Sequence, residues 1–357
     1  MATLTEVSVV ARKGVVFGIG FIILLMFYPL IRSAAFAIYY KYNPPPVDPP
    51  NARYSNLPLL EFPKIEYPAR PEVKLETITG GFPKLPTIAK VYLVDLNKSR
   101  LLTLDRYRQK ATAVGLSPDP VQIDDIRYRF MHTKIQASMV VNLITDQIDY
   151  KYDWTKDKDE IEPGNLEAPE REITKARSFF DRLGITKEDV AKGIGKATYY
   201  VATGSAFLPI NNYVEANFVR VDLFRADLDN FKFVTAGGDY SPINLTSSST
   251  KKPELNIIAA SYYYSRTVSK DEFSTYPLRG VEKAYQQLAS GQGFIVRNVT
   301  PTAVVRNISL AYYESNGPQD YIQPVYVFEG DKGFLAYVQA VDESKLVTAP
   351  VITPIAK

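Results

Sequence analysis

The hydrophobic pattern of this chain opens with an uninterrupted apolar run. Residues 14–31 (GVVFGIGFIILLMFYPLI) contain no charged residue and follow directly after Arg12 and Lys13. A helix rises by about 1.5 Å per residue, so this run extends roughly 27 Å, close to the thickness of a hydrocarbon core of about 30 Å. The pattern predicts a transmembrane helix over residues 14–40, with Arg32 long enough to reach the outer interface.

Charge and length predict the orientation of that helix. Arg12 and Lys13 favour a cytoplasmic N-terminus, which leaves residues 1–13 as a short head inside the cell. A cleaved signal peptide is the alternative, because residues 35–37 (AFA) have the small-x-small form of a cleavage site. The apolar run exceeds the usual ~7–15 residues of a signal peptide, so a retained single-pass anchor is favoured. Gly14 and Gly18 form a G-x-x-x-G pair suited to a homodimer.

A proline-rich stretch follows the apolar run. Nine prolines fall within residues 43–71. Proline favours the extended polyproline II conformation, which rises about 3.1 Å per residue. We therefore expect residues 41–86 to form a semi-rigid stalk that holds the rest of the chain away from the bilayer, either as a plain spacer or as a ligand for proline-binding partners.

Two later segments share one helical spacing of apolar positions. Each has apolar residues at i, i+3, i+7 and i+10, with a glycine directly after the last. The two sets are Leu104, Tyr107, Ala111, Val114 and Gly115, and Ile173, Ala176, Phe180, Leu183 and Gly184. An apolar stripe closed by a glycine indicates an amphipathic helix that ends at that glycine. The common spacing predicts a repeated structural unit.

Strand-like segments follow each predicted helix. After the first come residues 126–132, 135–143 and 147–154, and after the second come residues 197–203 and 213–225. A third block has a strand at 257–264, a helix that opens near Pro277 and ends at Gly291, and strands at 304–313, 323–328 and 334–341. Helices alternating with antiparallel strands predict an α+β fold, with units at 87–160, 161–250 and 251–344 and a tail at 345–357.

Composition removes several functional classes. The chain has no cysteine, which excludes disulfides, thiol catalysis and thiolate metal sites. Its 42 basic and 39 acidic residues give a net charge of +3. The two signs are mixed along the chain, so no basic cluster indicates nucleic-acid binding. A hydrophobic content of 46% is sufficient for a substantial core. We therefore expect an envelope protein whose extracytoplasmic part depends on its core alone.

Candidate chemistry is sparse. His132 is the single histidine of the chain and lies within a predicted strand, which indicates a structural role. No zinc motif and no G-x-S-x-G nucleophile elbow occurs. Acidic pairs can serve a glycosidase, but Asp227 and Asp229, like the acids at 157–160, are interpreted as solvated loop charge. The sequence therefore predicts no catalytic residue, no metal, no cofactor and a non-enzymatic protein.

Tyrosines gather at residues 199–200, 262–264 and 312–313. Neighbours along a strand point to opposite faces of a sheet, so each group directs one ring inward and one outward. Outward tyrosines are common in partner-binding surfaces. Equally, these tyrosines could lie on a sheet face that a helix covers, with no role in binding a partner.

The C-terminal block resembles a known family. The segments that carry the resemblance are GVEKAYQQL at 280–288 with Gly291, ISLAYY at 308–313, YIQPVYVF at 321–328 and AYVQAV at 336–341. Together they look like the extracytoplasmic domains of the bacterial YycH/YycI regulatory proteins. The resemblance implies a single-pass anchor, a repeated helix-and-sheet domain and a non-catalytic adaptor role toward a sensor histidine kinase of the cell envelope.

The residues matching the family pattern are the candidates for partner binding: Tyr312, Tyr313, Gln323 and Pro324. The long proline-rich stretch departs from the pattern and argues against a close juxtamembrane contact with a kinase. Two other functions stay open: a structural component of a secretion, pilus or cell-wall assembly machine, and an envelope hydrolase.

Overall fold

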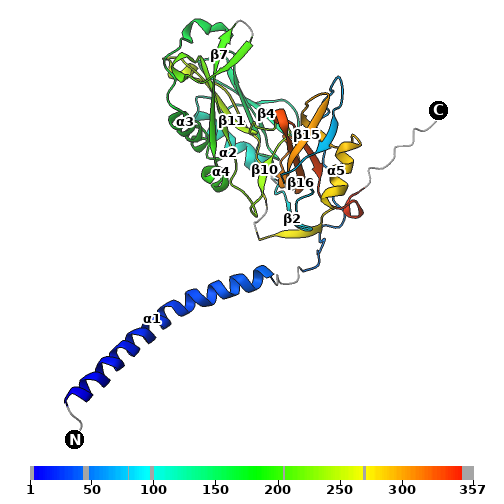
Figure 1. The fold of residues 1–357 in the computed structure, drawn as a ribbon. Coiled ribbons are helices and arrows are strands. Elements are labelled where there is room, and N and C mark those ends of the chain that lie inside the picture. The colour runs from blue at the N-terminus through cyan, green and yellow to red at the C-terminus, as the bar shows by residue number, and fades with distance from the viewer. Residues whose placement is uncertain are drawn as a thin grey trace. The chain divides into compact units, whose positions relative to one another are not determined.

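The computed structural model describes residues 4–42, 48–78, 80–96, 100–203, 206–267 and 271–347. The chain divides into two compact units, residues 1–49 and residues 50–357. The first contains the helix α1 (Leu4–Tyr42), which has Pro29 in its interior. The second, called the body below, contains two β-sheets and the remaining helices (Figure 1).

Helix α1 covers the predicted anchor and most of the predicted head. Arg12, Gly18 and Arg32 are exposed on it, and the Arg32 guanidinium lies 5.5 Å from the ring centre of Phe36. For Lys13 and Gly14 the structure describes only the helical backbone. In the part of the chain that the structure describes, no helix combines the length and apolarity needed to cross a membrane. The helix at 14–40 is therefore present, while its transmembrane character is not supported.

The larger sheet has nine strands among the described residues, and every pairing in it is antiparallel. Its order is β3 (Val121–Gln122), β4 (Arg127–Met131), β5 (Ala137–Asn142), β6 (Ile148–Tyr152), β12 (Ile257–Tyr262), β11 (Ile243–Ser248), β9 (Phe218–Leu223), β7 (Gly195–Thr203) and β8 (Ala206–Ile210). Helices α2 (Arg100–Thr112), α3 (Pro169–Arg182) and α4 (Glu188–Lys192) lie beside its strands in Figure 1.

One face of the larger sheet is apolar in register. The residues that pair across seven strands on this face are Phe130, Met139, Tyr150, Ala260, Leu245, Val221 and Ala197. They form one core with the apolar stripes of both predicted helices. The closing glycines Gly115 and Gly184 have φ of +79° and +58°, the left-handed conformation that suits a helix end. The two helices and their spacing are thus confirmed.

The smaller sheet has eight strands among the described residues. Its main order is β1 (Glu72–Leu75), β15 (Thr302–Tyr313), β16 (Tyr321–Gly330), β17 (Leu335–Gln339) and β14 (Phe294–Arg297). Strand β10 (Lys232–Val234) also pairs with β15, and β2 (Ile88–Leu93) pairs with β16 and β13 (Phe273–Pro277). Helix α5 (Val281–Ala289) packs against one face of this sheet.

Short 3-10 helices complete the body. They are Trp154–Lys156, Lys158–Glu160, Tyr213–Glu215, Pro253–Leu255, Asp331–Gly333 and Glu343–Lys345. The segment predicted as one strand over 213–225 therefore starts with a 3-10 turn, and only Phe218–Leu223 is a strand. Pro277 ends β13, and α5 begins four residues later. These differences shift boundaries, while the mixed α+β architecture is confirmed.

Strand β12 corrects the predicted organisation. Sequence analysis placed residues 257–264 in the C-terminal unit, but β12 lies inside the larger sheet between β6 and β11. Its alternating burial supplies Ile258, Ala260 and Tyr262 to the core beneath α2 and α3. A boundary at residue 251 therefore does not separate the two sheets.

The proline-rich segment corrects the predicted stalk. Residues 50–75 pack on the smaller sheet instead of extending away from the body. Leu57 is fully buried, and its N–H donates to the Lys345 carbonyl at 2.8 Å. Leu60 and Phe62 cover the sheet face opposite α5. Apolar residues placed between the prolines explain this packing, because they give an extended chain a surface to bury.

Candidate functional site

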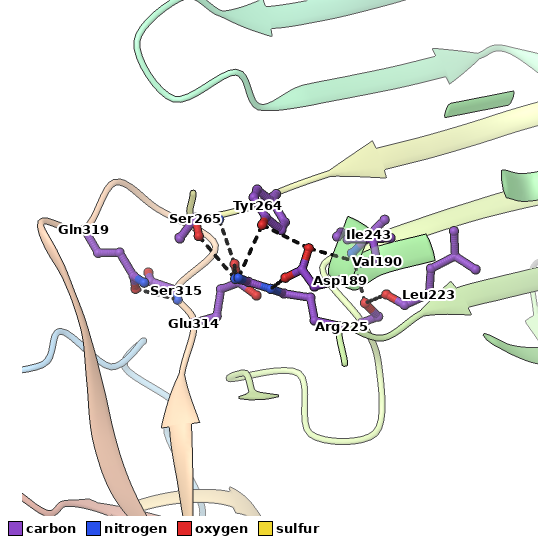
Figure 2. Close-up of polar contacts among 11 residues, drawn as sticks. Asp189, Val190, Leu223, Arg225, Ile243, Tyr264, Ser265, Glu314, Ser315 and Gln319 are labelled. Atoms are coloured by element: carbon purple, nitrogen blue, oxygen red, sulfur yellow. Dashed lines mark hydrogen bonds and ion pairs between the residues drawn. The ribbon is translucent and has the colours of Figure 1, made fainter. Parts of the chain in front are cut away.

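The most concentrated polar cluster of the body surrounds Arg225, just after the end of β9. Figure 2 shows its guanidinium between acidic groups from separate elements. Nε donates to Asp189 at 2.8 Å, and Nη1 donates to Glu314 at 2.8 Å and to the Ser265 carbonyl at 3.2 Å. The Arg225 side chain is only 5% exposed. We call Arg225, Asp189, Glu314, Tyr264 and Ser265 the arginine cluster.

Two aromatic rings enclose the guanidinium. Its Cζ lies 3.9 Å from the ring centre of Phe233 and 4.2 Å from that of Tyr264. The Tyr264 hydroxyl also donates to Asp189 at 3.0 Å. A cation held between two ring faces gains from both ring quadrupoles, so the arginine is fixed by packing as well as by charge.

The arginine cluster joins the two sheets. Arg225 and Tyr264 follow strands β9 and β12 of the larger sheet, whereas Glu314 follows β15 of the smaller sheet. Asp189 lies on α4, and its carbonyl accepts from the Ala226 N–H at 2.8 Å. Gly193 allows this close approach, because a Cβ there would lie 1.8 Å from the Phe224 carbonyl oxygen.

Burial dominates the electrostatics of the arginine cluster. It raises the pKa of Glu314, while Arg225 and the Ser265 N–H act in the opposite direction. Burial alone would lower the pKa of Arg225, but Glu314, Tyr264 and Asp189 together raise it above its ordinary value. Two carboxylates thus share one buried cation, with every charged group hydrogen-bonded. This arrangement stabilises a joint between sheets and offers no exposed nucleophile or base.

Asp229 forms a second polar site, on the smaller sheet. Its carboxylate accepts from Lys90 at 2.9 Å, from the Tyr92 hydroxyl at 2.5 Å and from the Tyr312 hydroxyl at 3.0 Å. Burial raises the pKa of Asp229, but these hydrogen bonds outweigh it and lower the pKa on balance. The interpretation of Asp229 as solvated loop charge is therefore wrong. Asp227 is exposed, so the two acids do not form a paired carboxylate site.

The predicted partner-binding residues lie inside the body. Tyr312, Tyr313, Gln323 and Pro324 are all buried. The ring of Tyr313 lies 4.8 Å from that of Phe62, centre to centre, and Gln323 donates to the Pro58 carbonyl at 3.0 Å. The prediction that one ring of the pair at 312–313 points outward is wrong, because both rings are buried. Tyr313 and Gln323 contact the proline-rich segment, and Tyr312 donates to Asp229.

His132 lies beside the turn that closes the first helix. Its Nδ1 accepts from the backbone N–H groups of Lys134 and Ile135 at 3.1 and 3.3 Å. Burial lowers the pKa of His132. These contacts organise a tight turn between β4 and β5. Among the described residues, no group of three or more histidines and acids is placed to hold a metal ion.

The second face of the larger sheet is polar. Residues that pair across the strands on this face are Lys196, Asp222, Asn244, Ser261, Asp149, Val140 and Arg129. A groove of about 520 Å³ lies over β4, β5, β6 and β12, beside the turn at residues 316–318. Tyr263 lines this groove, while the neighbouring Tyr262 is buried and donates to the Ile185 carbonyl. We call this surface the polar groove.

Sequence reasoning missed the arginine cluster. One sequence signal could have indicated it: Glu314 stands directly beyond the apolar end of a strand, where charge is costly unless it is paired. The partner of Glu314 is distant in sequence, and the pattern could not supply it. Asp189 carried no comparable signal.

Comparison with known proteins gives limited information. No protein-family model matches the sequence, and no curated protein matches it. A structurally similar chain is an uncharacterized protein from Eubacterium rectale, with a TM-score of 0.42 and 12% identity over 78% of this chain and 91% of that one. Another is the YpeB C-terminal domain of Bacillus megaterium, with a TM-score of 0.30 and 10% identity over 69% of this chain and 94% of that one. Neither is described as a YycH or YycI protein.

Proposed function

We propose that this protein is a non-enzymatic interaction protein of a cell envelope, and that it binds a protein partner through the polar groove. The observation that carries this proposal is the groove itself, a concave polar surface on the sheet face opposite α2 and α3. The carboxylate pair considered for a hydrolase, Asp227 and Asp229, gives no support to an enzyme, because the Asp229 carboxylate already accepts from three internal donors.

The charges along the groove favour an acidic partner segment. Arg127, Arg129 and Lys151 are exposed at its lining, and Asp149 is half-buried between β5 and β12. Arg127 is paired with Asp124 at 2.7 Å, and Lys151 lies 3.8 Å from Asp149. Three cations against two carboxylates therefore leave one net positive charge, that of Arg129. Charge complementarity of this kind accelerates association and selects partners. A sensor histidine kinase is the finer form of the proposal, which rests on the resemblance of the C-terminal block to YycH/YycI proteins.

Attachment to a membrane through α1 is part of the same proposal. The described apolar side chains of α1 are exposed along the helix, including Phe17 at 77% and Met26 at 74%. An apolar helix with this exposure requires a covering environment. Extraction of full-length protein from native membranes tests the attachment: retention in the pellet at alkaline pH supports it, and release into the supernatant contradicts it.

The absence of cysteine in the chain permits a direct test of the groove. Ser138, which lines it, is changed to cysteine in the full-length protein and labelled with a photocrosslinker. Ser290→Cys is the matched control, because this exposed serine follows α5, away from the groove. We expect Ser138→Cys, and not Ser290→Cys, to crosslink a defined partner in native membranes.

The charge argument is tested in the same assay. Adding Arg127→Glu and Arg129→Glu to the Ser138→Cys protein should reduce the crosslinked product about tenfold or more. Recovery of a sensor kinase supports the adaptor role, whereas recovery of secretion or cell-wall components favours an assembly role. Equal crosslinking from Ser138→Cys and Ser290→Cys, or no effect of the arginine changes, contradicts binding in the groove.

A further inference from the structure

A small cavity beside the arginine cluster has more cations than acids in its lining. It encloses about 80 Å³ where the last turn of α2, the loop after β5, the loop around Gly184 and the end of β12 meet. Its cationic lining residues are Arg106, Lys110, Lys187 and Arg266, and its acids are Asp95 and Asp146. Tyr264 lines this cavity and also contacts Arg225, so cavity and cluster share a wall.

The charges around the cavity do not cancel. Arg266 is paired with Asp95 at 2.9 Å, and Arg106 lies 3.9 Å from Asp146. Among the described residues, no carboxylate forms an ion pair with Lys110 or Lys187. Lys110 donates to the Gly184 carbonyl at 3.1 Å. Four cations against two acids leave two net positive charges at this cavity, whose charged lining residues are partly exposed.

Two further observations indicate a negatively charged occupant. Burial lowers the pKa of Lys110, Asp146 acts in the opposite direction, and Arg106 and Lys187 lower the pKa further. The two cations therefore repel Lys110 across the cavity, although Asp146 offsets part of this repulsion. The hydroxyl of Thr145, another lining residue, is buried and has no hydrogen-bond partner within the described chain. A buried polar group without a partner is costly, and an oxygen-rich anion would offset the excess positive charge beside it.

We propose that this cavity binds a small oxyanion of the phosphate or sulfate type. Ammonium, guanidinium and hydroxyl donors surround the space, and each forms charge-assisted hydrogen bonds with such oxygens. A water needs roughly 10–15 Å³ by this measure of volume, so about 80 Å³ corresponds to about five to eight waters, which is enough for a tetrahedral oxyanion. Larger phosphate esters exceed this volume.

The site spans the joint between the two sheets. Asp95 follows β2 of the smaller sheet, and its N–H donates to the Arg266 carbonyl at 2.6 Å. The lysines and Arg106 belong to elements of the larger sheet. An anion held here would draw together groups on both sides of the joint, so its binding should stabilise the folded body.

Lys187 offers a clean perturbation. It stands at the N-terminal boundary of α4, where its side chain makes no capping hydrogen bond, so Lys187→Gln removes charge without removing a cap. Lys192→Gln is the matched control, because Lys192 lies on the same helix and pairs with Glu188 away from this cavity. Both variants lose one positive charge.

Thermal unfolding of the full-length protein in detergent tests the proposal, with potassium phosphate compared with potassium chloride at equal ionic strength. We expect phosphate to raise the melting temperature of the wild type and of Lys192→Gln. Lys187→Gln should bind phosphate at least about tenfold more weakly, because it lacks one charged hydrogen bond to the anion. Without phosphate, Lys187→Gln should melt no earlier than the wild type, because it relieves repulsion.

Titration with sulfate and with glucose 6-phosphate tests the size of the site. Sulfate should act like phosphate, and glucose 6-phosphate should have no effect. The proposal is overturned by an equal phosphate response in Lys187→Gln and the wild type, by no phosphate response in the wild type, or by equal responses to phosphate and glucose 6-phosphate.

Discussion

Replacing Arg225 with methionine tests whether the arginine cluster joins the two sheets. Methionine keeps much of the apolar stem between Phe233 and Tyr264, but it removes the charge and all the hydrogen bonds of the guanidinium. Glu314, whose side chain is 2% exposed, would then be a buried carboxylate without its cation. Removing one partner of a buried ion pair costs about 3–5 kcal/mol, and this range is the loss of stability that we expect at pH 8.

The pH dependence of this loss follows from Glu314. Its pKa in the folded protein is raised above the ordinary value of 4.5, so this group favours the folded state most below pH 4.5 and progressively less as the pH rises through the folded pKa. Arg225 lowers that pKa, so its removal moves the window to higher pH. The penalty of Arg225→Met should therefore be smaller at pH 5 than at pH 8.

Urea unfolding followed by fluorescence provides the assay. Trp154 is the single tryptophan, and its ring lies 5.0 Å from that of Phe218 in the larger sheet, centre to centre. Arg171→Met is the control, because Arg171 is 75% exposed in its ion pair with Glu167 and exposed pairs contribute little. Its unfolding midpoint should stay unchanged.

A second substitution identifies the source of the penalty. Adding Glu314→Gln to Arg225→Met should recover at least about 1 kcal/mol, because a neutral amide oxygen can still accept from the Ser265 N–H. The reasoning is refuted if Arg225→Met costs less than about 1 kcal/mol at pH 8, far below the expected range, or if Glu314→Gln deepens the loss instead of relieving it.

Two further predictions concern the smaller sheet. Asp229→Asn should reduce the free energy of unfolding by about 1–2 kcal/mol at pH 7. The folded pKa of Asp229 lies below its ordinary value of 3.8, so its contribution is present above pH 3.8 and is lost as the pH falls through the folded pKa. If the urea midpoints of variant and wild type differed by the same amount at pH 7 and pH 3, the prediction would be contradicted. Leu57→Ala should reduce the free energy of unfolding by about 2–5 kcal/mol and expose residues 50–75 to limited proteolysis. Leu59→Ala is the control and should do neither, because Leu59 is 48% exposed. Equal protease resistance of both variants would indicate that Leu57 does not hold the segment.

Local patterns predicted the helices and most strands of the body. The spacing of Leu104, Tyr107 and Ala111 marks one buried face, and the structure places all three in the core. The closing glycines were equally local, since a left-handed backbone is a property of one residue. Such features depend on neighbours within a few positions, which a single sequence contains.

Long-range pairing could not be read from the same patterns. Strand β12 has the alternation expected of any half-buried strand, and nothing in residues 257–262 specifies that β6 and β11 are its neighbours. The proline-rich segment was misassigned for a related reason. Its extended backbone was expected from proline, but the sheet face that Leu60 and Phe62 cover is formed by residues more than 230 positions later.

The candidate sites followed the same division. The strands that contain Tyr313 and Gln323 were predicted, while the burial of those side chains depended on a segment from the other end of the body. The arginine cluster assembles residues from positions 189, 225, 264 and 314, and no local rule brings these together.

The strand order of the body also constrains its assembly during synthesis. The larger sheet uses residues 121–262, so all its strands exist once that stretch has left the ribosome. The smaller sheet combines β1 near residue 72 with β15, β16 and β17, which end at Gln339. Domains generally fold as their segments emerge, and pairing of distant segments is slow. The N-terminal segment of the body therefore has to wait, unpaired, until almost the whole chain has been made.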